Sequence, residues 1–311
     1  NVFLYFFILL FLLHFINFFL IKEKRMYVIC VVAQEFYQPT PSKKSYIPAS
    51  YVKYLESAGA RVAPIHIDKT EDEYRALFKS INGVLYPGGN VNTSTSGYAR
   101  AARLLFDLAM EVSSISDYFP LWGTCLGFQL MACVIGEKNG HVLSTTNNSD
   151  VALPLNFTKE AKESRMFKSF PKDTLHTLAT ESVTINSHKY SLTMDTYRKS
   201  ESLNTFYRVL TTNTTDNGKM FISTMEAYKY PFYGVQWHPE KSQFERTNTF
   251  TAHSPSAVKA AQCFADFFVS EVRKSCHSFS SDEEEKKVLI DEYTPSYTAD
   301  WTNFEQIFFF S

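Results

Sequence analysis

The sequence has almost no net charge and few cysteines. Its 311 residues include 31 Lys and Arg against 32 Asp and Glu, which leaves a net charge of −1 at pH 7. A domain that binds nucleic acid needs a basic surface, so this balance argues against a nucleic-acid partner. The five cysteines are scattered, and no cluster of Cys and His has the spacing of a metal site. We therefore expect no disulfide framework, no bound metal and no cofactor.

The apolar content is high enough for one large core. Hydrophobic residues make up 45% of the chain, and a chain of this length can bury them in a single α/β domain. Apolar strand patterns at 27–33, 62–67 and 84–86 alternate with helical patterns at 49–58, 72–80 and 99–112. This alternation predicts an α/β fold with a mostly parallel central sheet flanked by helices on both faces.

The second half of the chain, about 151–235, is richer in Thr, Ser and Tyr. Short β-type segments stand at 182–185, 206–212 and 220–225, and we expect them to add strands to the sheet. An amphipathic helix is predicted at 257–274, because apolar residues recur there at helical spacing. The acidic and lysine-rich segment Ser278–Lys287 predicts a solvated surface.

The ends of the chain carry targeting information. Residues 2–21 are almost wholly apolar and are followed by a charged segment at 22–25, so a signal peptide and a membrane anchor both fit. No initiator methionine, basic leading region or visible cleavage site accompanies this run, and we expect a truncated or mispredicted start. The predicted division is an apolar segment at 1–25, a folded domain at 26–277 and a C-terminal tail at 278–311.

Four N-x-S/T sequons occur, at Asn92, Asn147, Asn156 and Asn213. Together they make these asparagines candidate glycosylation sites and favour a route through the secretory pathway. Among the cysteines, Cys30 and Cys133 stand in apolar runs and are expected to be buried thiols.

Cys125 has the most informative surroundings of any residue. It stands in Gly123-Thr124-Cys125-Leu126-Gly127, after one apolar run and before another. A cysteine between two glycines at a strand-to-helix junction is typical of a nucleophile elbow, where a strained turn presents the side chain outward. A helix N-terminus also favours the thiolate and can hold an oxyanion. The alternative is a buried structural cysteine in a tight turn.

His238 is the histidine best placed to act as a base. It follows a short β-type run and opens His238-Pro239-Glu240, where the proline ends the strand. A His and a Glu two residues apart at a strand end point to the same side, so Glu240 can hold the imidazole in the tautomer that accepts a proton from Cys125. A structural histidine is the alternative reading of the spacing alone.

These motifs resemble the class I glutamine amidotransferase superfamily and, within it, the γ-glutamyl hydrolase family. The resemblance is carried by the two motifs above and by four further segments, namely YVKYLESAGARV at 51–62, FKSINGVLYPGG at 78–89, LPLNFT at 153–158 and LTTNT at 210–214. It covers roughly residues 27–275. It implies a flavodoxin-like three-layer arrangement with a catalytic domain at 26–277.

The resemblance also implies roles for individual residues. Cys125 would be the nucleophile, His238 the general base and later general acid, and Glu240 the group that orients His238. The oxyanion hole would be two backbone N–H groups, from Leu126 and from Gly89 in the Pro-Gly-Gly turn that follows a buried strand.

Weaker predictions concern other residues of the cleft. Gln129, four residues after the nucleophile, would face the substrate glutamate, where family members often carry Glu; a solvent-facing helical residue is the alternative. His188 matches a histidine that lines the family's site, against the alternative of a solvated loop histidine. Tyr46, Ser50 and Tyr51 stand at the entry to an early helix and could reach the cleft, but a core or capping role is the expectation.

The resulting expectation is a thiol hydrolase that cleaves the γ-glutamyl bonds of poly-γ-glutamyl folates through a γ-glutamyl thioester. It would act on a small-molecule substrate, form a homodimer and be lysosomal or extracellular. The alternatives are the glutaminase component of a glutamine amidotransferase, which would need a partner synthase, and a catalytically inactive binding relative.

Overall fold

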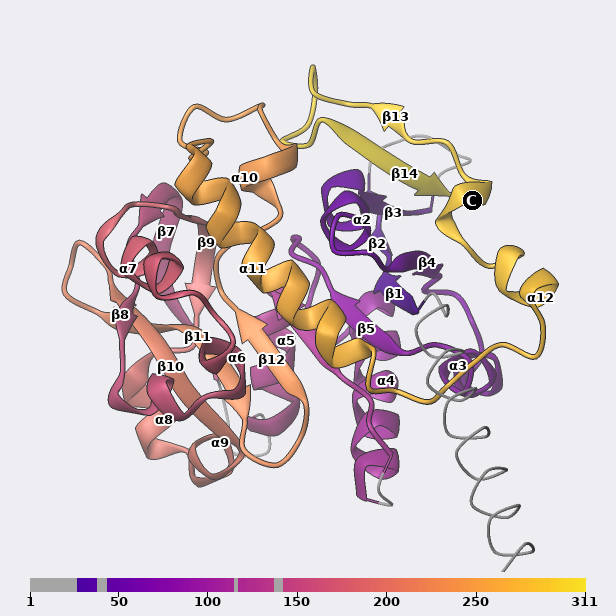
Figure 1. Cartoon of the computed structure of the whole chain (residues 1–311), viewed down its shortest axis with the longest axis horizontal. Coiled ribbons are helices and arrows are strands. Elements are labelled where there is room, and N and C mark those ends of the chain that lie inside the picture. The colour runs from indigo at the N-terminus through magenta and orange to yellow at the C-terminus, as the bar shows by residue number, and fades with distance from the viewer. Residues whose placement is uncertain (1–26, 38–43, 115–116, 137–141) are drawn as a thin grey trace, which may run out of the picture.

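The computed structural model describes residues 27–37, 44–114, 117–136 and 142–311. Its centre is an eight-stranded sheet with the order β4-β1-β5-β6-β12-β11-β10-β8 (Figure 1). In chain order these strands are β1 (Val28–Val32), β4 (Arg61–Ile65), β5 (Gly83–Tyr86), β6 (Leu121–Thr124), β8 (Asn156–Phe157), β10 (Tyr207–Thr214), β11 (Met220–Ala227) and β12 (Phe232–Val235). From β4 to β12 the strands run parallel, and β11, β10 and β8 continue the sheet antiparallel. The predicted mostly parallel sheet with extra strands from the second half is confirmed.

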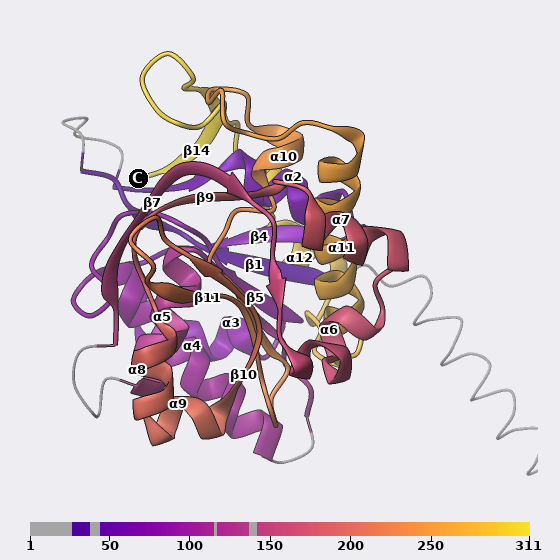
Figure 2. The same ribbon diagram turned by 90° about the vertical axis from the view of Figure 1, so that its left-hand side faces the viewer.

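Helices cover both faces of this sheet (Figure 2). The side chains of β1 alternate between two cores, with Ile29 and Val31 in one and Val28, Cys30 and Val32 in the other. All five are buried, as expected for a parallel strand covered on both sides. Helices α2 (Ala49–Glu56), α7 (Lys172–Thr180) and α11 (Pro255–Val272) contribute to the first core, and α3 (Glu71–Phe78), α4 (Gly97–Ser114) and α5 (Leu126–Gly136) to the second.

Short helices connect the larger elements. They are η2 (Lys159–Glu163), α6 (Arg165–Lys168), α8 (Met194–Lys199), α9 (Glu201–Phe206), α10 (Lys241–Phe244), α12 (Asp282–Lys286) and η3 (Ile290–Glu292). Helix α12 buries none of its residues, so the solvated surface predicted for this acidic segment is confirmed. None of the helices in the described part of the chain is both long and apolar enough to cross a membrane. The apolar segment predicted at 1–25 lies outside the described residues.

The segment predicted as a strand at 182–185 leads into β9 (Thr184–Ser191), which does not join the central sheet. It pairs antiparallel with β7 (Ser144–Leu153) as a separate arm. The reason lies in its sequence, since Asn186, Ser187 and His188 are too polar for a strand that helices cover on both faces.

Residues 278–311, predicted as a C-terminal tail, pack against the folded domain. Strand β14 (Gln306–Phe310) pairs with β3 (Ser45–Pro48) in a second sheet of order β13-β14-β3-β2, completed by β13 (Ser296–Tyr297) and β2 (Gln34–Glu35). Ile307, Phe308 and Phe310 are buried. The apolar end of the chain therefore closes over α2, which Figure 1 shows beside β14.

The predicted buried thiols are confirmed. Cys30 and Cys133 are 0% and 3% exposed, and no disulfide joins any two cysteines among the described residues.

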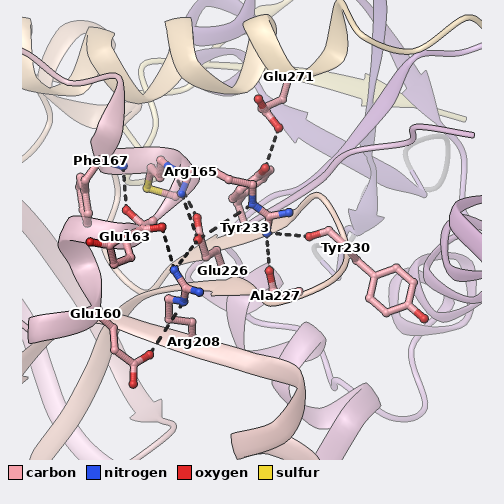
Figure 3. A network of polar contacts seen from close by, with 12 residues as sticks. Glu160, Glu163, Arg165, Phe167, Arg208, Glu226, Ala227, Tyr230, Tyr233 and Glu271 are labelled. Carbon is pink, nitrogen blue, oxygen red and sulfur yellow. Dashed lines mark hydrogen bonds and ion pairs between the residues drawn. The ribbon is translucent and has the colours of Figure 1, made fainter. Parts of the chain in front are cut away.

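A buried carboxylate, Glu226, holds the start of α6 against β11 (Figure 3). It is 2% exposed and accepts hydrogen bonds from the backbone N–H groups of Arg165, at 3.1 Å, and Met166, at 3.3 Å. The guanidinium groups of Arg165 and Arg208 lie 4.0 and 3.9 Å from the same carboxylate. Because these are the first helical N–H groups, Glu226 also satisfies donors that would otherwise be unpaired.

Arg165 extends this network to β12 and α11. Its guanidinium donates to the carbonyl oxygens of Ala227 and Tyr230 and lies 5.2 Å from the centre of the Tyr233 ring. The Tyr233 hydroxyl in turn donates to the buried Glu271 at 2.6 Å. The network thus ties together α6, β10, β11, β12 and α11 near the amino end of β12.

Replacing Glu226 by Ala should reduce the free energy of unfolding by about 3–5 kcal/mol, because two guanidinium groups and two N–H groups lose a buried partner. The matched control is Glu160→Ala: Glu160 is 55% exposed, lies 3.9 Å from Arg208, and its loss should cost less than about 1 kcal/mol. Urea denaturation of both variants measures the difference. Equal losses would contradict the central place given to Glu226.

Candidate active site

Three parallel strands end at one edge of the sheet and carry the predicted site. The pairs Tyr86↔Gly123 and Val235↔Thr124 align the carboxyl ends of β5, β6 and β12. The Pro-Gly-Gly turn follows β5, Cys125 follows β6, and His238 stands three residues after β12. Open α/β sheets commonly place their ligand sites at this edge.

Cys125 occupies a left-handed turn, with φ of 52°. That conformation is unfavourable for a residue with a β-carbon, so the surrounding packing must hold it. The Cys125 N–H donates to Val235 O at 2.8 Å, and α5 begins at the next residue. The side chain is 5% exposed, and Sγ lies 3.9 Å from Ser187 O on the β9 arm.

The glycines on either side of Cys125 are required by close packing. A β-carbon on Gly127 would lie 2.1 Å from the carbonyl oxygen of Tyr86, and one on Gly123 would lie 2.6 Å from the Gly127 carbonyl carbon. The turn can therefore press against β5 only with glycine at both positions.

His238 and Glu240 form a buried pair. His238 Nδ1 lies 2.7 Å from Glu240 Oε1, and the two residues are 5% and 1% exposed. With Nδ1 engaged, Nε2 is the ring nitrogen left for Cys125. Burial lowers the pKa of His238, but the Glu240 carboxylate and then Cys125 raise it by more, to about 9.

His238 and Cys125 can both lie close to Gly88 because glycine has no β-carbon. A β-carbon there would lie 2.6 Å from His238 Cε1, 2.7 Å from the Tyr51 hydroxyl and 3.1 Å from Cys125 Cβ. The Gly88 N–H donates to the Tyr51 hydroxyl at 2.8 Å and so is already occupied. Gly89, the predicted donor, is the next residue of the turn and lines the cleft together with Cys125 and Leu126.

This cleft has a volume of about 480 Å³. It is lined by Gly89, Asn90, Val91, Asn92, Thr93, Cys125, Leu126, Gln129, Leu143, Ser187, His188, Lys189 and Tyr190. A larger hollow of about 670 Å³ lies beside Phe157 and Phe167 and contains none of the predicted site residues. We assign the site to the smaller cleft because the cysteine, the oxyanion turn and the polar lining meet there.

Gln129 faces the cleft and not bulk solvent, so the solvent-facing alternative is wrong. It is 6% exposed, and its Nε2 donates to Tyr190 O at 2.7 Å and to Gln236 Oε1 at 3.3 Å. Since the amide nitrogen is engaged on both sides, the carbonyl oxygen is the atom that Gln129 can offer to a bound molecule.

His188 lies on β9 and lines the same cleft; the solvated-loop alternative is wrong. It is 4% exposed, with Nδ1 3.4 Å from Thr146 Oγ1 and Nε2 3.2 Å from Asn186 Oδ1. Burial, followed by the charge of His238, lowers the pKa of His188 from 6.5 to about 3. It therefore stays neutral and can act only through hydrogen bonds.

Tyr51 is the site residue that the sequence reasoning placed in a core or capping role. Its hydroxyl accepts from Gly88 N–H and lies 3.4 Å from His238 Nδ1. Burial raises the pKa of Tyr51 well above its usual value, so the hydroxyl remains protonated. Tyr46 instead stands on β3, and Ser50 is buried in α2. The role of Tyr51 becomes visible only in the structure, where α2 brings its hydroxyl next to His238 and Gly88.

The sequons divide into exposed and buried asparagines. Asn92, Asn147 and Asn156 are exposed. Asn213 is 4% exposed; its Nδ2 donates to Pro154 O at 2.6 Å and its Oδ1 accepts from Ser223 at 2.6 Å. A glycan on that nitrogen would displace β10 from its neighbours, so Asn213 is withdrawn as a glycosylation site. In the part of the chain that the structure describes, no three His, Cys, Asp or Glu side chains gather as a metal site.

A second buried carboxylate, Glu245, lies behind Glu240 at the end of α10. It is 1% exposed and accepts a hydrogen bond from Glu305 N–H at 2.6 Å, which connects it to the segment before β14. Burial raises its pKa to about 7, and the charge of Glu240 adds to this increase.

Comparison with known proteins gives one consistent match. The family model described as Peptidase C26 matches residues 28–240. The chain is 52% identical to γ-glutamyl hydrolase of Bos taurus over 269 residues, which cover 86% of this chain and 83% of the bovine protein. It is 51% identical to γ-glutamyl hydrolase of Homo sapiens over 267 residues, or 85% of this chain and 83% of the human protein.

A solved structure with a related fold is the glutaminase domain of Trypanosoma brucei CTPS with bound acivicin. Its TM-score is 0.52 at 15% sequence identity, covering 80% of this chain and 95% of that domain. At this identity the match concerns the fold alone.

Replacing Glu245 by Gln should flatten the dependence of stability on pH. The folded pKa of about 7 lies above the usual 4.5, so folding favours the neutral acid. That contribution is complete below pH 4.5 and is lost as the pH rises through about 7. Thermal unfolding of the parent should therefore lose more stability over this range than the Gln variant, whereas Glu292→Gln, at an exposed position, should follow the parent. Parallel curves for all three proteins would contradict the assignment.

Proposed function

This chain belongs to the Peptidase C26 family and is a γ-glutamyl hydrolase, and we propose that Cys125, His238 and Glu240 carry out its reaction on poly-γ-glutamyl folates. One observation supports these three assignments. Cys125 and His238 both lie next to Gly88, and Glu240 binds His238. The nucleophile follows β6, whereas the base and the orienting carboxylate both follow β12, and all three lie close together.

The first half of the reaction forms a thioester. Cys125 Sγ attacks the γ-carbonyl carbon of a glutamyl residue as a thiolate, because the raised pKa of His238 keeps the proton on Nε2. The carbonyl oxygen becomes an oxyanion that accepts hydrogen bonds from Leu126 N–H, at the start of α5, and from Gly89 N–H. The C–N bond then breaks, the proton on Nε2 passes to the leaving amine, and a γ-glutamyl thioester remains on Cys125.

The second half releases the acid. Water gives a proton to His238 Nε2 and adds to the thioester carbon at the same oxyanion site. The C–S bond breaks and leaves the thiolate beside the imidazolium, which restores the enzyme. Throughout, Glu240 holds Nδ1 at 2.7 Å and stabilises the imidazolium.

The lining of the cleft supports an amino-acid substrate with both charges. The carbonyl oxygen of Gln129 offers an acceptor for the ammonium or amide N–H of the glutamate, and Lys189 on the cleft rim offers a cation for its carboxylate. His188 adds no charge to the cleft, and Thr146 and Asn186 occupy its two ring nitrogens. These contacts fit a γ-linked glutamate chain, which carries charged groups, better than a substrate that offers only an uncharged amide.

The glutaminase alternative has weaker support than hydrolysis. The relatives at 51–52% identity are named γ-glutamyl hydrolases. The glutaminase domain shares only 15% identity and supports the fold alone. We therefore propose no partner synthase.

Location and assembly stay predictions. We propose passage through the secretory pathway to the lysosome or the outside of the cell, which the exposed asparagines at 92, 147 and 156 permit. A homodimer, expected from the family resemblance, can be tested by the mass of the purified protein in solution.

Replacing Cys125 by Ala should abolish hydrolysis, because the thioester cannot form, while the fold remains. The assay incubates the protein with a folate pentaglutamate and separates the products by chromatography. Cys133→Ala, which removes a thiol buried in α5, is the matched control and should keep its turnover. Turnover by Cys125→Ala at the parent rate would eliminate the proposed mechanism.

Replacing Gln129 by Leu should raise KM for γ-glutamyl substrates. The substrate loses its acceptor and Tyr190 O loses its donor, at a cost of about 1–3 kcal/mol for buried polar groups left unpaired. Steady-state kinetics measure the effect. KM and kcat within about twofold of the parent would mean that Gln129 does not contact substrate.

A further inference from the structure

Buried side chains hold the turn after β5 from three directions. Pro87 O accepts a hydrogen bond from the Tyr98 hydroxyl at 3.0 Å, Gly88 N–H donates to the Tyr51 hydroxyl at 2.8 Å, and Gly88 O accepts from Gln34 Nε2 at 2.7 Å. Tyr98, Tyr51 and Gln34 are 0%, 1% and 0% exposed. They come from α4, α2 and β2, so three separate elements meet at two successive residues.

The bond from Gln34 sets the direction of the next N–H group. Gly88 C=O and Gly89 N–H belong to one trans peptide unit, in which the two groups point in opposite directions. Fixing the carbonyl on Gln34 therefore aims the Gly89 N–H away from β2. Gly89 lines the cleft with Cys125, so this is the donor proposed for the oxyanion.

The backbone alone does not fix this peptide. Glycine stands on both sides of it, and glycine accepts either orientation of a flipped peptide unit at little steric cost. Gln34 also blocks any side chain at the second position, since a β-carbon on Gly89 would lie 1.6 Å from Gln34 Oε1. The glycine at position 89 thus allows Gln34 to approach. The same glycine would let the peptide rotate if Gln34 did not hold it.

Gln34 is poorly satisfied as a purely structural residue. Among the described residues, its buried Oε1 has no hydrogen-bond partner. Unpaired buried polar atoms are uncommon in a core, and a functional role is one explanation for them. The position of Gln34 is set by its backbone, which pairs with Tyr46 of β3. Its side-chain oxygen makes no hydrogen bond that would hold it.

We propose that Gln34 is a positioning residue for hydrolysis: it locks the Gly88–Gly89 peptide so that Gly89 N–H faces the cleft and receives the oxyanion. The inference rests on the proposed function. Gln34 does not touch the substrate and acts through the peptide that does.

The first test is the variant Gln34→Met, which keeps the side-chain volume and removes the donor. On folate pentaglutamate, kcat should fall on the order of 10–100-fold with KM within about twofold, because the lost contact matters only in the tetrahedral state. The control is Asn82→Leu. Asn82 is 2% exposed and also binds a backbone carbonyl, that of His277 at 2.8 Å, but at the amino end of β1. It should lose stability and keep kcat.

A second readout separates oxyanion binding from folding. The aldehyde N-benzoyl-L-glutamate γ-semialdehyde adds Cys125 Sγ to its carbonyl carbon, and the thiol proton moves to the oxygen, giving a hemithioacetal with no atom lost. The matching γ-alcohol binds without forming a bond. The inhibition constant of the alcohol divided by that of the aldehyde measures how much the oxyanion site favours the aldehyde. This ratio should fall at least tenfold in Gln34→Met and stay unchanged in Asn82→Leu.

A third variant, Gln34→Glu, covers the case in which Gln34→Met does not fold. A protonated carboxyl can donate to Gly88 O and a carboxylate cannot, so kcat of this variant should fall, relative to the parent, as the pH rises through the carboxyl pKa. A parent-like aldehyde ratio in Gln34→Met, or a Gln34→Glu profile that follows the parent, overturns the inference and leaves the proposed function intact. A parent enzyme that does not cleave the pentaglutamate overturns both.

Discussion

Gly127 has no β-carbon, and this allows the turn after β6 to rest directly on the carbonyl of Tyr86. The contact fixes the distance between β5 and the start of α5, and Cys125 takes its left-handed backbone as a result. The residues around it inherit this geometry. Leu126 N–H opens α5 beside the sulfur, and the Pro-Gly-Gly turn continues from the strand against which Gly127 packs. A larger residue at 127 would separate the nucleophile from the turn that faces it.

Two kinds of force then share the work of building the site. Apolar side chains on both faces of β1 pack into the two cores and hold the sheet in place. This close packing fixes where the strands end. Directional bonds from Tyr98, Tyr51 and Gln34 place the atoms of one short turn. Packing alone cannot orient a peptide flanked by glycines, and hydrogen bonds alone cannot bring three strand ends together. The site needs both.

The sequence predicted those parts of the structure that depend on local patterns. Alternating strands and helices, the glycines around Cys125 and the two-residue spacing from His238 to Glu240 are all contained in short windows, and the structure places these residues together. Tyr51 was assigned to the core because nothing near it in sequence shows that Gly88 lies above its hydroxyl. Gln34 carries no local signal at all. The strand at 306–310 was missed for a related reason, since its partner β3 stands at the other end of the chain. Asn213 matched a short pattern whose meaning depends on exposure, which the pattern does not encode.

Strand β14 is made after the site residues but pairs with a strand that comes before them. As the chain leaves the ribosome, Cys125 and His238 emerge well before residues 306–310, and the sheet that contains β2 and β3 lacks its third strand until then. Glu305 and Gln306, which bind Glu245 and Lys53, arrive at the same time. A chain whose synthesis has passed His238 but has not reached β14 therefore holds the thiol and the imidazole without the strand that closes over α2.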